Sequence, residues 1–468
     1  MQADLLIRGG TVVNAHARTE ADVAVKDGVV VAVGRGEAMP EARETVDATG
    51  LHVLPGIVDV HVHFRDPGLT HKEDWATGSA AAAAGGVTTV FDMPNTDPPT
   101  GTLEGYEAKR EAAAAKSVVN FGLYGLLGTD NLHLLEGLAE AGVAGFKLFM
   151  GDTTGHLPCP DDGTILEGFE IIAELGLRTT VHAENTPILH RRQRRLQEAG
   201  RTDPLAHEAS RPDVCILEAL SRTAIFAEWT GCRVHIAHES SRLSLPYLRF
   251  FKERGVDLTS ETCPQYLVLS TDDMAGPNGA ALRVNPPIRG PENREPLFEA
   301  LASGLIDVLS TDHAPHLPED KSRNSIWDTA SGLTGVETSM RLMLSFVNQG
   351  RLTLEAYVRM ASAAPARAFG LYPRKGVLQP GADADIVLVD LAKRGTIRGE
   401  ELHSKGRITP YEGRETVGAP VMTIVNGTVV MRNGEVIGRS GTGRQVRPRM
   451  PPPQPRNRDK AMKAILRA

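Results

Sequence analysis

Hydrophobic and polar positions alternate strictly in the segment VDVHVH, residues 58–63. This period of two is typical of a β-strand, and it places His61 and His63 on the same side, one pleat apart. Two imidazoles so arranged can bind one metal ion. The alternative is a pair of histidines satisfied by hydrogen bonds on a half-buried strand. The strand stops at Pro67 and Gly68, so the histidines lie at its C-terminal end.

A hydrophobic strand followed by a helical stretch recurs along the middle of the chain. Helical stretches begin at residue 80 and cover residues 165–175 and 216–228, between the strands. Repeated strand–helix units favour a parallel sheet, and eight of them predict a (β/α)₈ TIM barrel with its active site at the C-terminal strand ends. After the first strand, the predicted strands are 87–92, 118–123, 145–150, 179–182, 233–238, 256–261 and 306–312.

Both chain ends carry short β signals instead. They occur before residue 34, with a turn at Asp27-Gly28, and again at residues 384–389 and 422–430, with a hairpin turn at Asn426-Gly427. We expect the two ends to combine into one small β-sandwich. The predicted domains are 1–54 and 371–439 for the two parts of the sandwich, 55–370 for the barrel, and 440–468 for a basic, Pro-rich tail.

The tail includes Pro451-Pro452-Pro453 and many Arg and Lys residues. We expect it to be extended or mobile, with a short last helix from Lys460. A solvated end is the simpler interpretation, and a partner-binding arm is the alternative.

Composition is that of a soluble globular protein: 41% hydrophobic and 23% charged residues, with a net charge of −7. The negative charge argues against a nucleic-acid surface. The chain has no apolar run near the roughly 20 residues of a membrane helix, and its start lacks signal-peptide features. We therefore expect a cytoplasmic protein that binds neither nucleic acid nor membrane. The four cysteines, Cys159, Cys215, Cys232 and Cys263, have no CxxC spacing, which predicts reduced thiols and argues against Cys-based zinc binding.

Metal-binding residue types gather at the ends of the predicted strands. Each has an ordinary explanation, such as a rim hydrogen bond or, for Asp312, a helix cap. Lys147 is the exception, because it lies in an apolar strand between Phe146 and Leu148 and a buried ammonium is costly. The convergence of all six at one barrel face predicts a metal site. The candidate ligands are His61, His63, Lys147, His182, His238 and Asp312.

The chain resembles the cyclic amidohydrolases, which include dihydroorotases, allantoinases and hydantoinases. The resemblance runs from about Ala3 to Val436. It rests on the segments PGIVDVHVHFRDPG, AAAAGGVTTVFDMPNT, GFKLFM, VHAEN, HIAHESS, STDHAPH, GLTGVET and QPGADADIVLVD.

In that family carbon dioxide carbamylates the lysine of strand four, and the carboxylate formed bridges two zinc ions. The resemblance therefore implies two Zn²⁺ per chain, bridged by Lys147 as N6-carboxylysine. It implies that one ion is held by His61, His63 and Asp312, and the other by His182 and His238. His235 is a weaker candidate, because the family motif matches His238.

The resemblance also implies hydrolysis of a cyclic amide. Two cations lower the pKa of a shared water, which would attack a ring carbonyl while a metal stabilises the oxyanion. Asp312 would act as the catalytic residue that carries the proton to the departing nitrogen. Some bacterial dihydroorotases replace the lysine with an aspartate from a DDG-like loop. This chain also has Asp161-Asp162-Gly163; we prefer Lys147 because it lies on the strand, and we expect the Asp pair to form a turn.

The predicted substrate is dihydroorotate, whose exocyclic carboxylate needs a fixed cation and neutral donors. Arg65, Asn95, Asn285 and His316 match dihydroorotase-like positions and are the candidate substrate-binding residues. Arg65 could instead pair with Asp66 or Asp92, Asn95 could cap a turn, and His316 could be a loop residue. Thr153 and Thr154 are candidates for a loop that closes over substrate.

The sequence thus predicts a dihydroorotase that interconverts dihydroorotate and N-carbamoyl-L-aspartate in pyrimidine synthesis. Another cyclic amidohydrolase, an allantoinase or a hydantoinase, is the alternative. A non-catalytic subunit that scaffolds a carbamoyltransferase is a third, disfavoured because all six ligands are present. The family analogy predicts a homo-oligomer, dimer or tetramer, and raises association with aspartate carbamoyltransferase.

Overall fold

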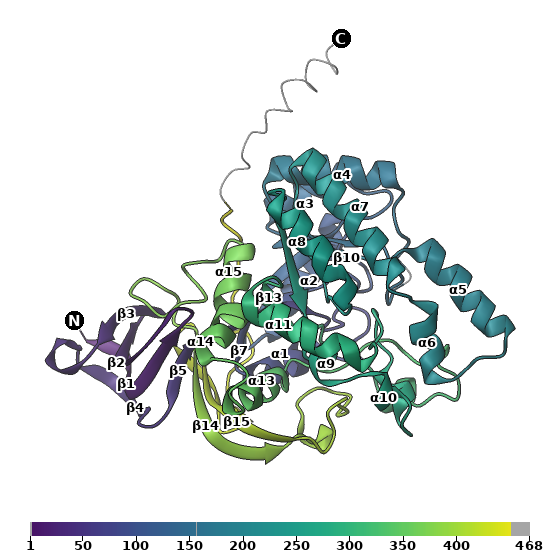
Figure 1. Cartoon of the computed structure of the whole chain (residues 1–468). Coiled ribbons are helices and arrows are strands. Elements are labelled where there is room, and N and C mark those ends of the chain that lie inside the picture. Colours follow the sequence, from purple (N-terminus) through teal and green to yellow (C-terminus); the bar gives the residue numbers. More distant parts are fainter. Residues whose placement is uncertain (1, 156, 451–468) are drawn as a thin grey trace, which may run out of the picture.

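Eight parallel strands form a barrel in the computed structural model, which describes residues 2–155 and 157–450 (Figure 1). The strands follow one another in chain order around the sheet. The ring closes where Val62 bridges His313 and the His63 amide donates to the His313 carbonyl at 2.8 Å. The predicted TIM barrel is confirmed. Its strands are β6 (Ile57–Val62), β7 (Val87–Asp92), β8 (Asn120–Leu126), β9 (Gly145–Phe149), β10 (Arg178–His182), β11 (Arg233–Ile236), β12 (Leu258–Thr262) and β13 (Val308–Leu309).

The last barrel strand is much shorter than predicted, two residues in place of 306–312. Thr311 leaves the ladder because its hydroxyl and amide both donate to Asp59 inside the barrel, at 2.5 and 3.2 Å. Asp312 then takes a left-handed backbone, with φ 47°. The third strand begins at Asn120, since the Val118 amide donates to Ser79 Oγ at 3.0 Å instead of a neighbouring strand.

Helices cover the outside of the barrel, and the three that were predicted all start earlier than expected; the one predicted from residue 216 starts at Val214. The first begins at Trp75, because Asp74 and Thr77 form a capping box. Asp161 caps another by accepting from the Thr164 amide at 3.0 Å, so Asp161-Asp162-Gly163 opens a helix and is not a separate turn. The helices of this region are α1 (Trp75–Ala84), α2 (Leu103–Lys116), α3 (Leu135–Ala141), α4 (Asp162–Leu175), α5 (Thr186–Glu198), α6 (Pro204–Ser210), α7 (Val214–Thr230), α8 (Leu245–Glu253), α9 (Pro264–Val268), α10 (Thr271–Met274), α11 (Arg294–Ser303), α12 (Pro318–Lys321), α13 (Ser339–Asn348), α14 (Leu354–Val358) and α15 (Ala364–Ala368).

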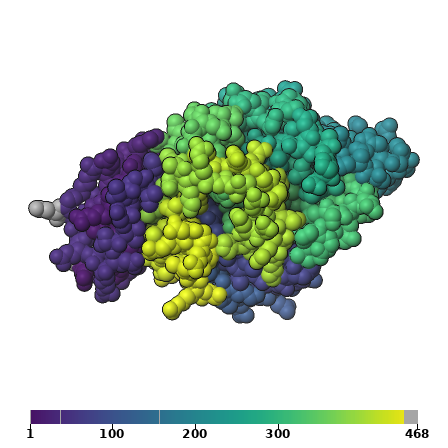
Figure 2. Space-filling model, turned by 90° about the horizontal axis from the view of Figure 1, so that it is seen from below, coloured from purple at the N-terminus to yellow at the C-terminus, as the bar shows by residue number. Residues whose placement is uncertain are grey.

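Strands from both chain ends form a second sheet, as predicted. The link is β5 against β14, where Leu54 pairs with Val387, and side chains from both ends, such as Val23 and Ile386, share one hydrophobic core. Figure 2 shows this side of the molecule, with C-terminal residues between the N-terminal strands and the barrel. The nine strands are one continuous sheet: β1 (Ala3–Asn14), β2 (Ala17–Lys26), β3 (Val29–Gly34), β4 (Ala42–Asp47), β5 (His52–Pro55), β14 (Ile386–Thr396), β15 (Glu415–Val425), β16 (Thr428–Arg432) and β17 (Glu435–Val436).

The first residues of the expected tail pack against the barrel. The Phe121 amide donates to the Arg444 carbonyl at 3.0 Å, and the Val446 amide donates back to Phe121 at 2.8 Å. The Arg449 amide donates to the Gly370 carbonyl after α15 at 2.9 Å. The segment up to Arg449 is therefore tied to the barrel and is not extended into solvent. Pro451-Pro452-Pro453 and the helix expected from Lys460 lie outside the described residues. Among the described residues, no helix combines the length and apolar character needed to cross a membrane.

A buried carboxylate joins the sheet to the barrel. Asp385 is 4% exposed and forms an ion pair with Lys375. It also accepts from Asn120 Nδ2 at 3.0 Å and from the Asn426 amide at 2.9 Å. One side chain therefore fixes the start of β14, the start of β8 and the hairpin turn after β15.

We predict that Asp385→Ala destabilises the protein by about 3–5 kcal/mol, because removing one partner of a buried pair leaves the other polar groups unsatisfied. Thermal and urea unfolding followed by circular dichroism measure the loss. Asp130→Ala, in an exposed loop, is the control and should change stability by less than about 0.5 kcal/mol. Equal effects of the two substitutions would contradict this role of Asp385.

Candidate metal centre

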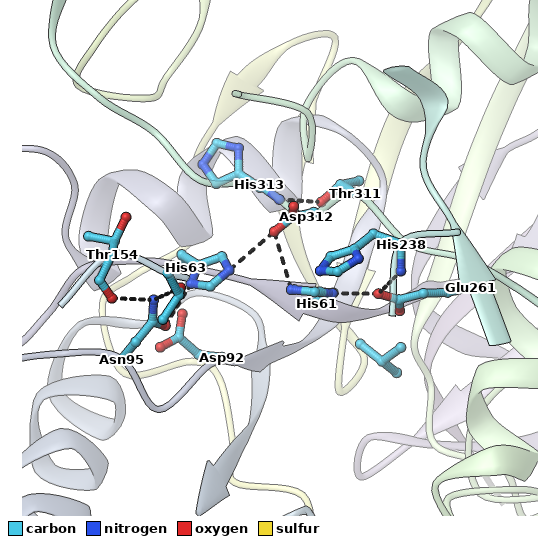
Figure 3. Close-up of polar contacts among 12 residues, drawn as sticks. His61, His63, Asp92, Asn95, Thr154, His238, Glu261, Thr311, Asp312 and His313 are labelled. Carbon is cyan, nitrogen blue, oxygen red and sulfur yellow. Dashed lines mark hydrogen bonds and ion pairs between the residues drawn. The ribbon is translucent and has the colours of Figure 1, made fainter. Parts of the chain in front are cut away.

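The end of β6 and the segment after β13 bring together one group of three predicted ligands. Asp312 Oδ1 lies 3.2 Å from His61 Nε2 and 3.1 Å from His63 Nε2, and ligand atoms of all three residues lie within 4.8 Å of one another. Figure 3 shows both rings pointing at the carboxylate. All three side chains are buried.

The protons on these histidines point away from Asp312. His61 Nδ1 donates to Glu261, and His63 Nδ1 donates to Asn95 Oδ1 at 2.8 Å. Burial lowers the pKa of both histidines, so their Nε2 atoms are lone pairs that face a carboxylate oxygen. Three acceptors in contact repel one another unless a cation lies between them. The group therefore fits a divalent metal ion.

The ends of β10 and β11 supply a second pair. The ring centroids of His182 and His238 are 4.6 Å apart, and those of His238 and His61 are 5.2 Å apart. His182 Nε2 donates to Glu184 at 2.8 Å, which leaves Nδ1 as a lone pair. His238 Nδ1 is buried without a partner in the described part of the chain. These nitrogens fit a second ion beside the first.

Lys147, on β9, is 0% exposed, and its Nζ makes no hydrogen bond or ion pair within the described residues. The centroid of the Phe149 ring lies 5.2 Å from Nζ. Burial lowers the pKa of Lys147 to about 8. The lowered pKa enlarges the neutral fraction of the amine, which is the form that reacts with carbon dioxide, and a carbamate formed there would be an anion among ligands arranged for cations. The site thus fits the predicted modified lysine.

Three ligand-bearing turns adopt backbone conformations that side chains other than glycine rarely take. Arg65, His238 and Asp312 have φ angles of 63°, 40° and 47°. Such conformations cost about 1–3 kcal/mol each and persist where the surrounding structure imposes them. The positive φ angle ends the extended backbone at each of these three residues and turns the side chain of that residue toward the barrel axis.

A pocket opens above these residues and is also lined by loop residues 152–154 and 284–285. Arg65 lies in its wall, 2% exposed, and no carboxylate of the described chain lies within ion-pair distance. Asn285 also lines the pocket, and its Oδ1 is buried without a partner. The alternative pairing of Arg65 with Asp66 or Asp92 does not form: these carboxylates bind Lys116 and Lys109.

Two candidates for substrate binding have other contacts. Asn95 accepts from His63 and donates to Thr153 Oγ1 at 3.3 Å and the Thr154 carbonyl at 3.1 Å, so it joins a ligand to the loop over the pocket (Figure 3). His316 lies behind Arg65 and outside the pocket wall: its Nε2 is 3.3 Å from the guanidinium, and Lys72 lies 3.2 Å from its Nδ1.

The structure also excludes some weaker candidates and adds residues that the sequence analysis missed. His235 is bonded inside the barrel to Thr259 and Glu261, at 2.8 and 3.1 Å. Asp161 and Asp162 are exposed at the start of α4, and neither belongs to the group. Glu261 and Glu184, which orient His61 and His182, had no assigned role. Glu261 could have been found from the sequence because it is a carboxylate at the end of a predicted barrel strand. Glu184 could have been found because it lies in the polar end of the segment VHAEN.

Comparisons with known proteins agree with this architecture. Residues 52–430 match the model of the Amidohydrolase family. A solved structure of L-hydantoinase (dihydropyrimidinase) from Arthrobacter aurescens superposes with a TM-score of 0.93 at 38% identity, covering 95% of this chain and all of that one. An allantoinase from Rubrobacter xylanophilus is 42% identical over 95% of this chain and 98% of its own length. A dihydroorotase from Methanothermobacter thermautotrophicus is 39% identical over 91% of this chain and 94% of its own length.

These relatives differ in substrate name but align with nearly the whole chain. Together with the barrel and the ligand group at its C-terminal end, they establish the class of enzyme. The chain belongs to the amidohydrolase family and is a hydrolytic cyclic amidohydrolase.

Proposed function

We propose that this protein is a two-metal hydrolase that opens the five-membered ring of a hydantoin-type substrate, hydantoin itself or allantoin. The observation that carries the metal chemistry is the unpaired Lys147 amine, which lies buried in the same pocket wall as five metal-binding side chains. Two divalent cations, proposed as zinc, would activate water and polarise the ring carbonyl there. The choice of a five-membered ring is supported by the relatives named allantoinase and L-hydantoinase.

The chain's own side chains then have defined tasks. Lys147, once carbamylated, would hold both ions, with His61, His63 and Asp312 on one side and His182 and His238 on the other. Asp312 is the one carboxylate of this set, so it is the residue proposed to carry a proton to the departing ring nitrogen. Asn95 keeps His63 in the tautomer that leaves Nε2 as an acceptor.

Dihydroorotate, the substrate predicted from the sequence, becomes the second candidate. The comparisons support hydantoin and allantoin better, but one observation favours dihydroorotate. The buried guanidinium of Arg65 lines the pocket without a carboxylate partner, and an exocyclic carboxylate would supply one. Asn285 would accept from a ring N–H of the same substrate through its unpartnered Oδ1, and His316 would support Arg65 from behind.

The remaining expectations are tested separately. Size measurement in solution tests the predicted homo-oligomer, and co-purification with aspartate carbamoyltransferase tests the association raised by the family analogy. Localisation in the cytoplasm stays a prediction, as do the domain boundaries at residues 54, 370 and 439.

We predict that a chelator abolishes hydrolysis and that zinc restores it fully only with bicarbonate present, because the bridging group needs carbon dioxide. Lys147→Ala should lower kcat by at least about 1,000-fold and lose bound zinc. A short carboxylic acid such as propionate should restore part of both by occupying the vacated space. Zinc content by mass spectrometry and turnover are the readouts. An active Lys147→Ala enzyme with two zinc ions would contradict the proposal.

A side-by-side assay of hydantoin, allantoin and dihydroorotate on zinc-loaded protein identifies the ring. We expect the highest kcat/KM on one of the five-membered rings, with Arg65→Met changing it by less than about 10-fold. If dihydroorotate is the best substrate and Arg65→Met lowers its turnover by about 100-fold or more, the second candidate is correct instead. Loss of a charge-assisted carboxylate contact accounts for a change of that size.

A further inference from the structure

A buried carboxylate behind His182 has no task in the proposed chemistry. Glu184 is 0% exposed and accepts from His182 Nε2. The same oxygen accepts from the Arg211 guanidinium. The carboxylate of Glu184 therefore forms an ion pair with Arg211 while it accepts from His182. An acceptor at Nε2 fixes the ring so that Nδ1 stays a lone pair.

Arg211 is itself held in place by a second arginine. Its carbonyl accepts from Arg289 Nη1 at 3.1 Å, and Arg289 Nε donates to Ser240 Oγ at 3.2 Å. Ser240 follows His238 by two residues. A continuous chain of buried polar contacts therefore joins the turn that carries His182 to the turn that carries His238.

The other side of the His182 ring is closed by a glycine. A Cβ at Gly151 would lie 2.7 Å from His182 Nε2 and 2.9 Å from Glu184 Cβ. The backbone after β9 therefore packs directly on the contact between the two side chains. The ring cannot rotate without displacing this backbone or breaking the ion pair.

The two halves of the metal centre differ in what supports them. The half with His61 and His63 has its own carboxylate ligand, Asp312. The half with His182 and His238 has two histidines and, among the described residues, no carboxylate aimed at both. The metal affinity of this second half therefore depends more strongly on the orientation of its histidines than the metal affinity of the first half does.

We propose that Glu184 and Arg211 are positioning residues that set the affinity of the second half, the ion held by His182 and His238. The inference rests on the proposed two-metal function. It goes beyond that function by naming the ion that is lost first when the Glu184–Arg211 pair is removed. A partner that orients a ligating histidine is typically worth 10–100-fold in metal affinity.

The test removes both charges together. Arg211→Met alone would leave a buried, unpaired carboxylate and risk unfolding, whereas Glu184→Gln/Arg211→Met keeps the volume and is neutral. Zinc per chain after dialysis, the Kd of each zinc by competition with a chromophoric chelator, and the melting temperature of the metal-free protein are measured. Asp203→Asn/Arg201→Met, an exposed ion pair on the loop before α6, is the matched control.

We expect wild type and control to retain two zinc ions, and the Glu184/Arg211 double variant to retain one, with the second bound 10–100-fold more weakly and the metal-free melting temperature little changed. The single variant Arg211→Lys, which keeps Glu184 and a cation beside it, should bind the second ion more tightly than the double variant does. If the double variant binds both ions as wild type does, the positioning role is wrong. If wild type itself binds fewer than two, the proposed function fails instead.

Discussion

Burial of the Lys147 amine without a partner is the constraint on which the site depends. A charged ammonium in that position would be costly, because no carboxylate or carbonyl of the described chain bonds to it. The five ligands around it are acceptors and favour positive charge between them. Conversion of the amine to a carbamate, neutralised by two cations, would satisfy both demands at once.

The barrel makes this arrangement possible by ending its strands abruptly. His238 and Asp312 leave their strands with positive φ angles, so side chains from distant parts of the chain turn toward one axis. The supporting residues lie one layer further out: Glu261 behind His61, Asn95 behind His63, and Glu184 with Arg211 behind His182. The strain in the backbone is thus offset by hydrogen bonds that fix each ring.

Much of this was predictable from sequence, for identifiable reasons. The ligands follow hydrophobic strand segments, and parallel strands bring their carboxyl ends to one face, so six residues could be grouped without coordinates. The partners of those ligands could not, because Glu261 reaches His61 across the barrel, 200 residues away in the chain. The same limit explains the shortened β13, which depends on Asp59, and the position of His316 behind Arg65. The comparisons favour the alternative ring over the predicted one, and Arg65 alone does not define a substrate.

The most direct test is anomalous diffraction at the zinc edge, from crystals grown with zinc and bicarbonate. The account predicts two peaks, one beside His61, His63 and Asp312 and one beside His182 and His238. It also predicts density extending from Lys147 Nζ to both ions. A single peak, or two peaks beside an unmodified Lys147, would contradict it.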